Sequence, residues 1–227
     1  MTTFIVAVAP VFLIIIFIYV KDKYEKESKR VLFYNFIMGA FLSILISTIL
    51  YTFQAKLFNP ANEFSVLDQF IQAFFVVALI EEFSKYIIVY LGAQRRLFFN
   101  EPFDGIIYCV MVSMGFAFVE NLLYVFESGL PTAIIRAFTA VPAHATFGVI
   151  MGYFMGKAKF SNNRIKWNLV GLFTAILFHG AYDFFLFINF IPGISIGAIV
   201  SLIVGVVLSR KAIKAHQNNS KFNIEKL

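Results

Sequence analysis

Charged residues are scarce in this chain of 227 residues, since only 14% are Asp, Glu, Lys or Arg, whereas 60% are hydrophobic. Soluble globular domains are about 45–50% apolar, well below the fraction in this chain. The mean hydropathy is correspondingly high, at +0.81. No segment is long and polar enough to form a separate soluble domain. We therefore predict an all-α polytopic membrane protein, because a chain in lipid must satisfy its backbone polar groups within helices or a closed barrel.

Cysteine is nearly absent, because Cys109 is the only one, and this excludes an internal disulfide and CxxC metal spacing. The sequence has no HExxH motif, which excludes the zincin arrangement. It also has no GxSxG or GxGD motif, so the serine and aspartyl mechanisms are not supported. The net charge of +6 could suggest a nucleic-acid partner, but the basic residues lie in loops, as membrane topology requires. We therefore expect no nucleic-acid partner.

Seven apolar stretches separated by polar loops predict about seven transmembrane helices of roughly 20 residues each. Alternate loops are rich in Lys and Arg, which places the N-terminus outside and the C-terminus in the cytoplasm. We expect one membrane domain over residues 1–227: two N-terminal spans in 1–63, a four-helix catalytic core in 64–188, and the last span with a basic cytoplasmic tail in 189–227. The predicted spans cover residues 4–20, 31–53, 64–91, 103–126, 132–156, 167–187 and 194–208.

Glu81, Glu82 and Lys85 interrupt the apolar run of the third span. Ionisable groups inside a membrane are costly, and by default they indicate function. Glu81 and Lys85 are four residues apart and share a helical face, whereas Glu82 points about 100° away. A buried ion pair that only fixes helix packing is the alternative, but it explains one of the two glutamates.

Each of the next three spans also carries an ionisable group. His179 and Asp183 are four residues apart, so the carboxylate can orient the imidazole. His144 precedes glycines at intervals of four, a spacing that lets another helix approach closely. Glu120 shares a face with Tyr124 in the fourth span. His144 could instead form a simple hydrogen bond in helix packing. Glu120 could instead be a partly hydrated carboxylate near the end of its helix. The four spans together predict one active or binding centre in spans 3 to 6.

Carboxylates and imidazoles in a partly dry cavity are suited to activating water. A buried glutamate can act as a general base, and imidazoles can stabilise an oxyanion. Alternatively, Glu81, His144 and His179 can hold a metal such as Zn²⁺ and leave one position open for water. The residue spacing does not separate these two mechanisms, and it does not decide whether Glu81 or Glu82 is the base.

Several motifs resemble the PrsW family of bacterial intramembrane proteases over about residues 7 to 215. The matching motifs occur in the family's order: Glu81-Glu82-x-x-Lys85, Glu101-Pro102-Phe103-Asp104-Gly105, Gly115-Phe116-Ala117-x-x-Glu120-Asn121-x-x-Tyr124, His144 with Gly148 and Gly152, and His179-Gly180-x-Tyr182-Asp183. The resemblance implies membership of the superfamily of CAAX prenyl endopeptidases, which share a helical membrane core.

The resemblance implies a catalytic set of Glu81, Glu82, His144 and His179, with Glu120 and Asp183 assisting. Lys85, Asn121 and Tyr124 are expected to support them. It also implies a multi-pass protein of the bacterial plasma membrane that makes the first cut in a membrane-spanning anti-sigma factor and so activates an extracytoplasmic-function sigma factor. Two other hypotheses remain: a CAAX-like peptide-processing protease, and a non-catalytic haem-binding or proton-coupled membrane protein that uses the two histidines.

Overall fold

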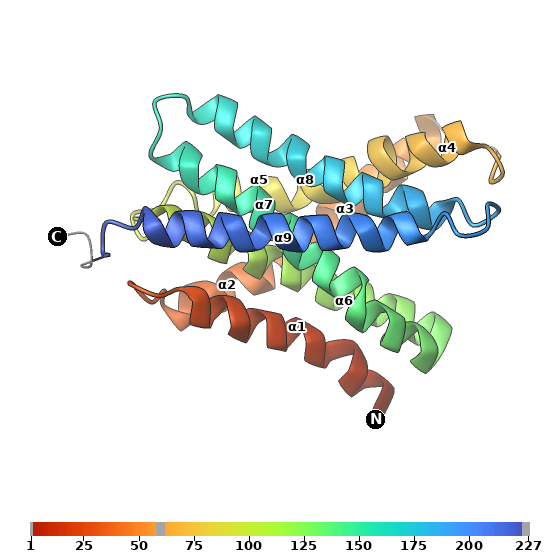
Figure 1. The fold of residues 1–227 in the computed structure, drawn as a ribbon, viewed down its shortest axis with the longest axis horizontal. Coiled ribbons are helices and arrows are strands. Elements are labelled where there is room, and N and C mark those ends of the chain that lie inside the picture. Colours follow the sequence, from red (N-terminus) through yellow and green to blue (C-terminus); the bar gives the residue numbers. More distant parts are fainter. Residues whose placement is uncertain (1, 58–61, 224–227) are drawn as a thin grey trace.

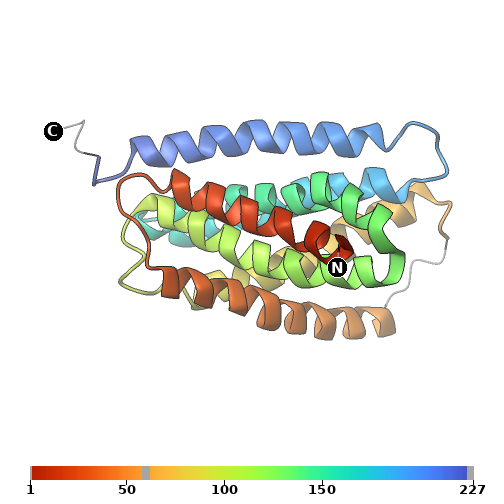
Figure 2. The ribbon, with the colours of Figure 1, turned by 90° about the horizontal axis from the view of Figure 1, so that it is seen from below.

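The computed structural model describes residues 2–57 and 62–223, and within these ranges every regular element is a helix. The helices run roughly along one long axis, and the loops gather at the two ends of the bundle (Figure 1, Figure 2). The prediction of an all-α membrane protein is confirmed. The elements are α1 (Thr2–Lys21), α2 (Lys29–Met38), η1 (Gly39–Ser43), α3 (Ile44–Leu57), α4 (Val66–Ile71), η2 (Gln72–Ala78), α5 (Leu79–Leu91), α6 (Pro102–Phe138), α7 (Ala140–Lys159), α8 (Arg164–Phe187) and α9 (Ile196–Asn218).

The centre of the bundle is formed by α6 and α7, whose backbones touch. A Cβ on Gly152 of α7 would lie 2.3 Å from the carbonyl oxygen of Gly105, and one on Gly156 would lie 2.1 Å from that of Pro102. Small residues at these positions therefore let the two helices approach closely, as the glycine spacing predicted. The residues of α6 from Phe103 to Ala117 are all buried.

Two helical stretches contain a π-helical turn, η1 between α2 and α3 and η2 between α4 and α5. Such turns are rare and often lie at functional sites. Here η2 directly precedes Glu81 and Glu82, and η1 begins at Gly39, which crosses α6 at the carbonyl of Val112. The two π-turns therefore lie where helices cross or where the ionisable cluster begins.

The long helix α6 turns back on itself near the end of the bundle. Gly129 has a φ of 75° and a ψ of −161°, a conformation that side chains with a Cβ rarely adopt, and Pro131 follows it. The first part of α6 therefore ends at this turn, and the second part returns along the bundle and leads into α7 (Figure 2).

The outer surface of the bundle is apolar, with large hydrophobic side chains such as Leu13, Phe33 and Phe173 each more than 60% exposed. An apolar surface of this extent fits a lipid environment. Five helical stretches of the described chain are long and apolar enough to cross a membrane: Thr2–Lys21, Lys29–Leu57, Pro102–Lys159, Arg164–Phe187 and Ile196–Asn218.

The predicted count of seven spans differs from these five stretches for two physical reasons. Pro102–Lys159 is one apolar stretch but reverses direction at Gly129. The stretch from α4 to α5 carries Asp68, Glu81, Glu82 and Lys85, which are too many charges for an ordinary span. The number of crossings and their orientation therefore remain predictions.

The last helix is longer than predicted. We expected the seventh span to end at Leu208 and a tail to follow, but α9 continues to Asn218. This continuation contains no Gly or Pro, and it is held in place because Gln217 Nε2 donates to the carbonyl of Lys21 over 2.6 Å. Much of the basic tail is therefore the end of a packed helix.

Candidate active site

The start of α5 places two carboxylates and an ammonium group inside the bundle. Lys85 Nζ lies 2.7 Å from Glu82 Oε1 and 3.7 Å from Glu81 Oε2, and all three side chains are buried. The sequence spacing favoured Glu81 as the partner of Lys85, but the closer pair is formed with Glu82, three residues away. Ser84 holds the helix against η1, because its hydroxyl lies 2.7 Å from that of Ser43.

His179 of α8 lies between carboxylates from two helices. Its Nδ1 is 2.8 Å from Glu82 Oε1, and its Nε2 is 3.2 Å from Asp183 Oδ2 and 4.0 Å from Glu81 Oε2. Carboxylates accept hydrogen bonds, so both ring nitrogens of His179 act as donors and the ring is an imidazolium in this arrangement. Asp183 therefore contacts His179 as the spacing of four residues predicted.

His144 of α7 has a different set of partners. Lys85 Nζ lies 3.2 Å from Nδ1, and Glu120 Oε2 lies 2.7 Å from Nε2. An ammonium group only donates, so Nδ1 accepts and Nε2 carries the proton that is donated to Glu120. His144 is therefore a neutral imidazole. The two imidazole rings are 5.3 Å apart and nearly perpendicular.

A cavity of about 760 Å³ lies beside this cluster. Its polar part is formed by Glu81, Glu120, His144, His179 and Asp183, and its remaining walls are largely apolar. Apolar walls with a few convergent polar groups are typical of binding sites. Side chains from α3, α5, α6, α7, α8 and α9 contribute to the lining.

Not every predicted site residue faces this cavity. Tyr124 lines it and lies under the Arg136 guanidinium, which is 4.1 Å from the ring centroid. Glu82 and Lys85 lie behind the lining and contact Glu81 and the histidines. Asn121 is buried, and its amide donates to the carbonyl of Ala7 over 2.7 Å. Asn121 therefore connects α6 to α1 and does not reach the cavity.

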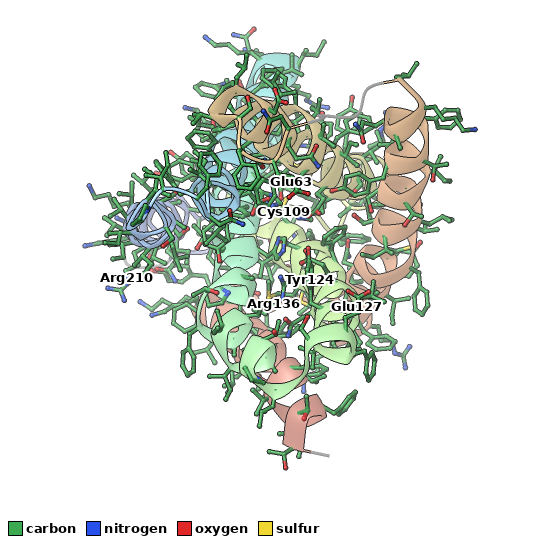
Figure 3. The ribbon with its side chains drawn as sticks, turned by 90° about the vertical axis from the view of Figure 1, so that its right-hand side faces the viewer. Glu63, Cys109, Tyr124, Glu127, Arg136 and Arg210 are labelled. Atoms are coloured by element: carbon green, nitrogen blue, oxygen red, sulfur yellow. The ribbon has the colours of Figure 1, made fainter. Side chains whose placement is uncertain are left out.

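Two cavity residues were missed at the sequence level. Tyr51 of α3 donates its hydroxyl to Glu81 Oε1 over 3.0 Å. Arg136 donates to Glu120 Oε2 over 2.9 Å and to Asn121 Oδ1 over 2.7 Å. Figure 3 shows Arg136 and Tyr124 side by side near the centre of the bundle, whereas Arg210 lies at its edge. The only sequence signal for Arg136 was its position as a basic residue within an apolar stretch. No sequence signal indicated Tyr51.

The donor set fits a divalent metal. One donor atom each from Glu81, His144 and His179 lies within 4.8 Å of the others. Glu81 Oε2 is buried and has no hydrogen-bond partner among the described residues. With His179 protonated, four carboxyl groups face three cationic side chains, Lys85, Arg136 and His179.

Metal binding at this site is coupled to proton release. A dication would displace the second proton of His179, and the Nδ1–H of the ring would still be directed to Glu82. A divalent ion or a haem iron would each have to displace a protein partner of His144, since both of its ring nitrogens are already hydrogen-bonded.

Comparison with known proteins identifies the family of this chain. A family model described as PrsW family intramembrane metalloprotease matches residues 27–209. Protease PrsW of Geobacillus kaustophilus is 40% identical over 182 residues, which is 79% of this chain and 77% of that protein. Protease PrsW of Halalkalibacterium halodurans is 36% identical over 78% of this chain and 80% of that protein.

A further relative extends the match to nearly the whole chain. Protease PrsW of Clostridioides difficile is 34% identical over 230 aligned residues, covering 96% of this chain and 92% of that protein. No solved structure matches the chain. The molecule is thus a multi-pass intramembrane protease of bacterial type. The chain belongs to the PrsW family.

Proposed function

We propose that this protease cleaves its substrate with Glu81 as the general base. The observation that carries the assignment is the difference between the two adjacent carboxylates. Glu82 is fully buried away from the cavity, and its Oε1 contacts both Lys85 and His179. Glu81 lines the cavity, and its Oε2 has no hydrogen-bond partner in the described chain. The Oε2 of Glu82 also has no hydrogen-bond partner in the described chain, so the difference is one of position: of the two glutamates, only Glu81 lines the cavity in which a water and a peptide bond can meet.

The other groups have separate roles in this proposal. Glu82 fixes the positions of Lys85 and His179 through its two short contacts. His179 and His144 both lie beside Glu81. The protonated ring of His179 can donate from Nε2 to the oxyanion that develops on the substrate carbonyl, whereas the single ring proton of His144 is donated to Glu120. Asp183 and Glu120 hold the two rings in place. A divalent ion held by Glu81, His144 and His179 would add Lewis acidity at the same carbonyl.

A substrate helix can reach this cavity from the side, between α3 and α6. One face of α3 lines the cavity through Ile44, Ser47, Thr48 and Tyr51. On the opposite wall, Leu123 and Tyr124 of α6 are 57% and 47% exposed. Next to η1 the gap between the two walls is closed, because η1 packs on α6. The helix α3 packs against η1 and α5. The open part therefore lies beyond η1, toward the Gly129 end of the bundle.

We also propose that the substrate is a membrane-spanning anti-sigma factor in the bacterial plasma membrane. The cavity lies within the apolar part of the bundle, so a substrate must present its peptide bond at membrane depth. This geometry supports a membrane-embedded substrate. The particular substrate class rests on the resemblance of the sequence motifs to those of the PrsW family.

The test is cleavage of a co-reconstituted anti-sigma factor by purified protein in lipid vesicles. Glu81→Gln should lower the rate by about 10²- to 10⁴-fold, which is the usual contribution of a general base. Glu127→Gln is the matched control, because Glu127 is exposed beside the Gly129 turn. Cleavage by Glu81→Gln at the wild-type rate would contradict the assignment of the base. Cleavage of other membrane peptides but not of the anti-sigma factor would contradict only the assigned substrate.

A further inference from the structure

A second polar cavity lies at the opposite end of the bundle from the Gly129 turn. It has a volume of about 230 Å³ and is lined by three cationic side chains: Arg95, Lys159 and Arg164. No Asp or Glu of residues 2–57 and 62–223 lines it. The loops at this end are the ones rich in Lys and Arg, which the charge pattern assigns to the cytoplasm. The cavity therefore concentrates positive charge at the level where helices leave the membrane.

The floor of this cavity is held by a network of hydrogen bonds. Gln94 Nε2 donates to Asn168 Oδ1 and to the carbonyl of Met155, both over 2.8 Å, and Asn168 Nδ2 donates back to Gln94 Oε1 over 3.2 Å. Both amide side chains are buried. Lys159 Nζ donates to the carbonyl of Gln94 over 2.6 Å, which fixes the ammonium group at the edge of this floor. The cavity is therefore built on a rigid polar frame.

The two arginines have no acidic partners in the described part of the chain. Arg95 lies over the ring of Tyr90, 5.0 Å from its centroid, and neither it nor Arg164 forms an ion pair with a carboxylate. Arg164 is the first residue of α8, a helix of 24 residues. The N-terminus of a helix carries partial positive charge, which adds to the potential of the side chains. Three cations and a helix N-terminus thus converge in a cavity that no described carboxylate lines, and Asp104 acts on Lys159 only through its charge, without an ion pair.

The surroundings of the cavity are apolar on the side of the membrane. Ile165 lines the cavity and is 75% exposed, and Leu91 and Leu169, each next in sequence to a lining residue, are 49% and 43% exposed. A ligand that combines an anionic phosphate with hydrocarbon chains matches both the cationic lining and these exposed side chains. Basic pockets between membrane helices at the cytoplasmic side bind lipid head groups of this kind.

We propose that this cavity binds the phosphate of an anionic phospholipid headgroup. The three cations come from the segment after α5, the end of α7 and the start of α8. These are the three helices that carry Glu81, His144 and His179. A bound headgroup therefore ties together the inner ends of the helices that form the candidate active site. The proposal does not depend on which residue acts as the base.

The test compares two variants that remove the same charge from the same two segments, the turn after α5 and the first turn of α8. Arg95→Gln with Arg164→Gln removes the two guanidinium groups from the cavity. Arg96→Gln with Lys166→Gln removes two exposed cations that do not line it. Each protein is reconstituted with phosphatidylcholine and phosphatidylglycerol, and native mass spectrometry counts the phosphatidylglycerol that remains bound after extraction. Thermal unfolding of each variant establishes that it is folded.

We expect the first variant to retain about tenfold less phosphatidylglycerol than the wild type, since each cation near anionic lipid contributes appreciably to the free energy of binding. The second variant should retain as much as the wild type. Equal retention by all three proteins, or equal loss in both variants, would overturn the site. In a further arm, inorganic phosphate is added to wild-type protein in phosphatidylcholine alone. It should not raise the unfolding temperature, whereas stabilisation equal to that by phosphatidylglycerol would overturn the lipid assignment in favour of free phosphate.

Discussion

At the scale of single residues, Glu82 is the buried carboxylate that we propose supports Lys85 and His179 without acting as the base. It is 0% exposed, and its Oε1 lies 2.7 Å from Lys85 and 2.8 Å from His179. Glu82→Gln would leave the Lys85 charge buried with only the more distant Glu81 as a partner. Breaking such a pair costs about 3–5 kcal/mol of stability. Thermal unfolding in detergent should show this loss of stability. Glu127→Gln, at an exposed carboxylate, should unfold at the wild-type temperature. Equal unfolding temperatures for Glu82→Gln and the wild type would contradict the structural role of Glu82.

Tyr51 is the residue that most directly controls the orientation of Glu81. Its hydroxyl donates to Glu81 Oε1 over 3.0 Å, which leaves Oε2 as the oxygen without a partner. A hydrogen bond to a charged group contributes about 1.5–3 kcal/mol. Tyr51→Phe should therefore lower kcat by about tenfold or more and leave KM unchanged, because the ring that lines the cavity stays in place.

Steady-state cleavage assays measure this effect, with Tyr34→Phe as the control. Tyr34 lies on α2 and is 57% exposed on the outer surface. A higher KM with an unchanged kcat in Tyr51→Phe would show that the hydroxyl binds substrate and does not position the base.

At the scale of the elements, the contact between α6 and α7 depends on glycine. A Cβ on Gly152 would lie 2.3 Å from the carbonyl oxygen of Gly105, so the two backbones would have to separate. Gly152→Leu should destabilise the protein by about 1–3 kcal/mol or more, as overpacking does. It should also lower activity, because His144 lies two helical turns before Gly152 on α7.

The matched control for this contact is Gly197→Ala in α9. The nearest atoms to a Cβ there belong to the ring of Phe185, a side chain, whereas those at Gly152 belong to the backbone of α6. Unfolding temperatures and cleavage rates of both variants test the argument. A Gly152→Leu protein as stable and active as Gly197→Ala would show that the close approach of α6 and α7 is not required.

The candidate metal site joins three elements, because its donors come from α5, α7 and α8. A ligand that binds only the folded state stabilises it, by about 2.7 kcal/mol at a concentration of 100 times Kd. Removing bound zinc with phenanthroline should therefore lower the unfolding temperature by several degrees and abolish cleavage, and added Zn²⁺ should restore both.

Metal analysis of the purified protein completes this test. His144→Ala and His179→Ala should each lose the bound zinc, whereas a substitution of the third histidine, His216→Ala, should retain it, since His216 stacks on Tyr153 far from the cluster in the fold. Full activity in protein free of metal would establish the glutamate mechanism without an ion.

The elements also show which features could be predicted from the sequence. Contacts within one helix follow from residue spacing, so the approach of Asp183 to His179 was foreseeable from their separation of four. The close packing at Gly152 followed from small residues at regular intervals. The contact of Tyr51 with Glu81 spans 30 residues and two helical stretches, and periodicity does not specify which helices are neighbours. The choice of Glu82 over Glu81 as the nearer partner of Lys85 depends on side-chain rotamers, which the sequence does not show.

At the scale of the whole molecule, the two ends of the bundle differ in chemistry. One end has the Gly129 turn and the approach to the candidate active site, and the other gathers the basic loops, the end of α9 and a group of buried carboxylates. Asp22 and Glu27 come from the loop between α1 and α2, and burial raises the pKa of both carboxyl groups. These groups connect the first loop to the start of α6 and to the C-terminal segment.

Glu101 is the carboxylate that joins the start of α6 to the C-terminal segment. It is 1% exposed, and the Ser220 hydroxyl donates a hydrogen bond to its Oε2. Burial, together with the nearby carboxylates Asp22, Glu25 and Glu27, raises the pKa of Glu101 to about 7, against the opposing effect of the Ser220 hydrogen bond. The folded protein therefore holds more protons than the unfolded chain between the ordinary pKa of 4.5 and about 7.

Because the folded state binds the extra proton, its stability must fall as the pH rises through this window. We expect the unfolding temperature in detergent to be lower at about pH 8 than at about pH 5, and Glu101→Gln to reduce this slope because an amide does not titrate. Glu127→Gln, at an exposed carboxylate, should keep the wild-type slope. Limited proteolysis of the segment around Ser220 should become faster at the higher pH in the wild type and stay unchanged in Glu101→Gln. The same slope in wild type and Glu101→Gln would place the pH dependence in other groups, and unchanged proteolysis of the wild type would remove the Glu101 charge as a control on the contact between α6 and the C-terminal segment.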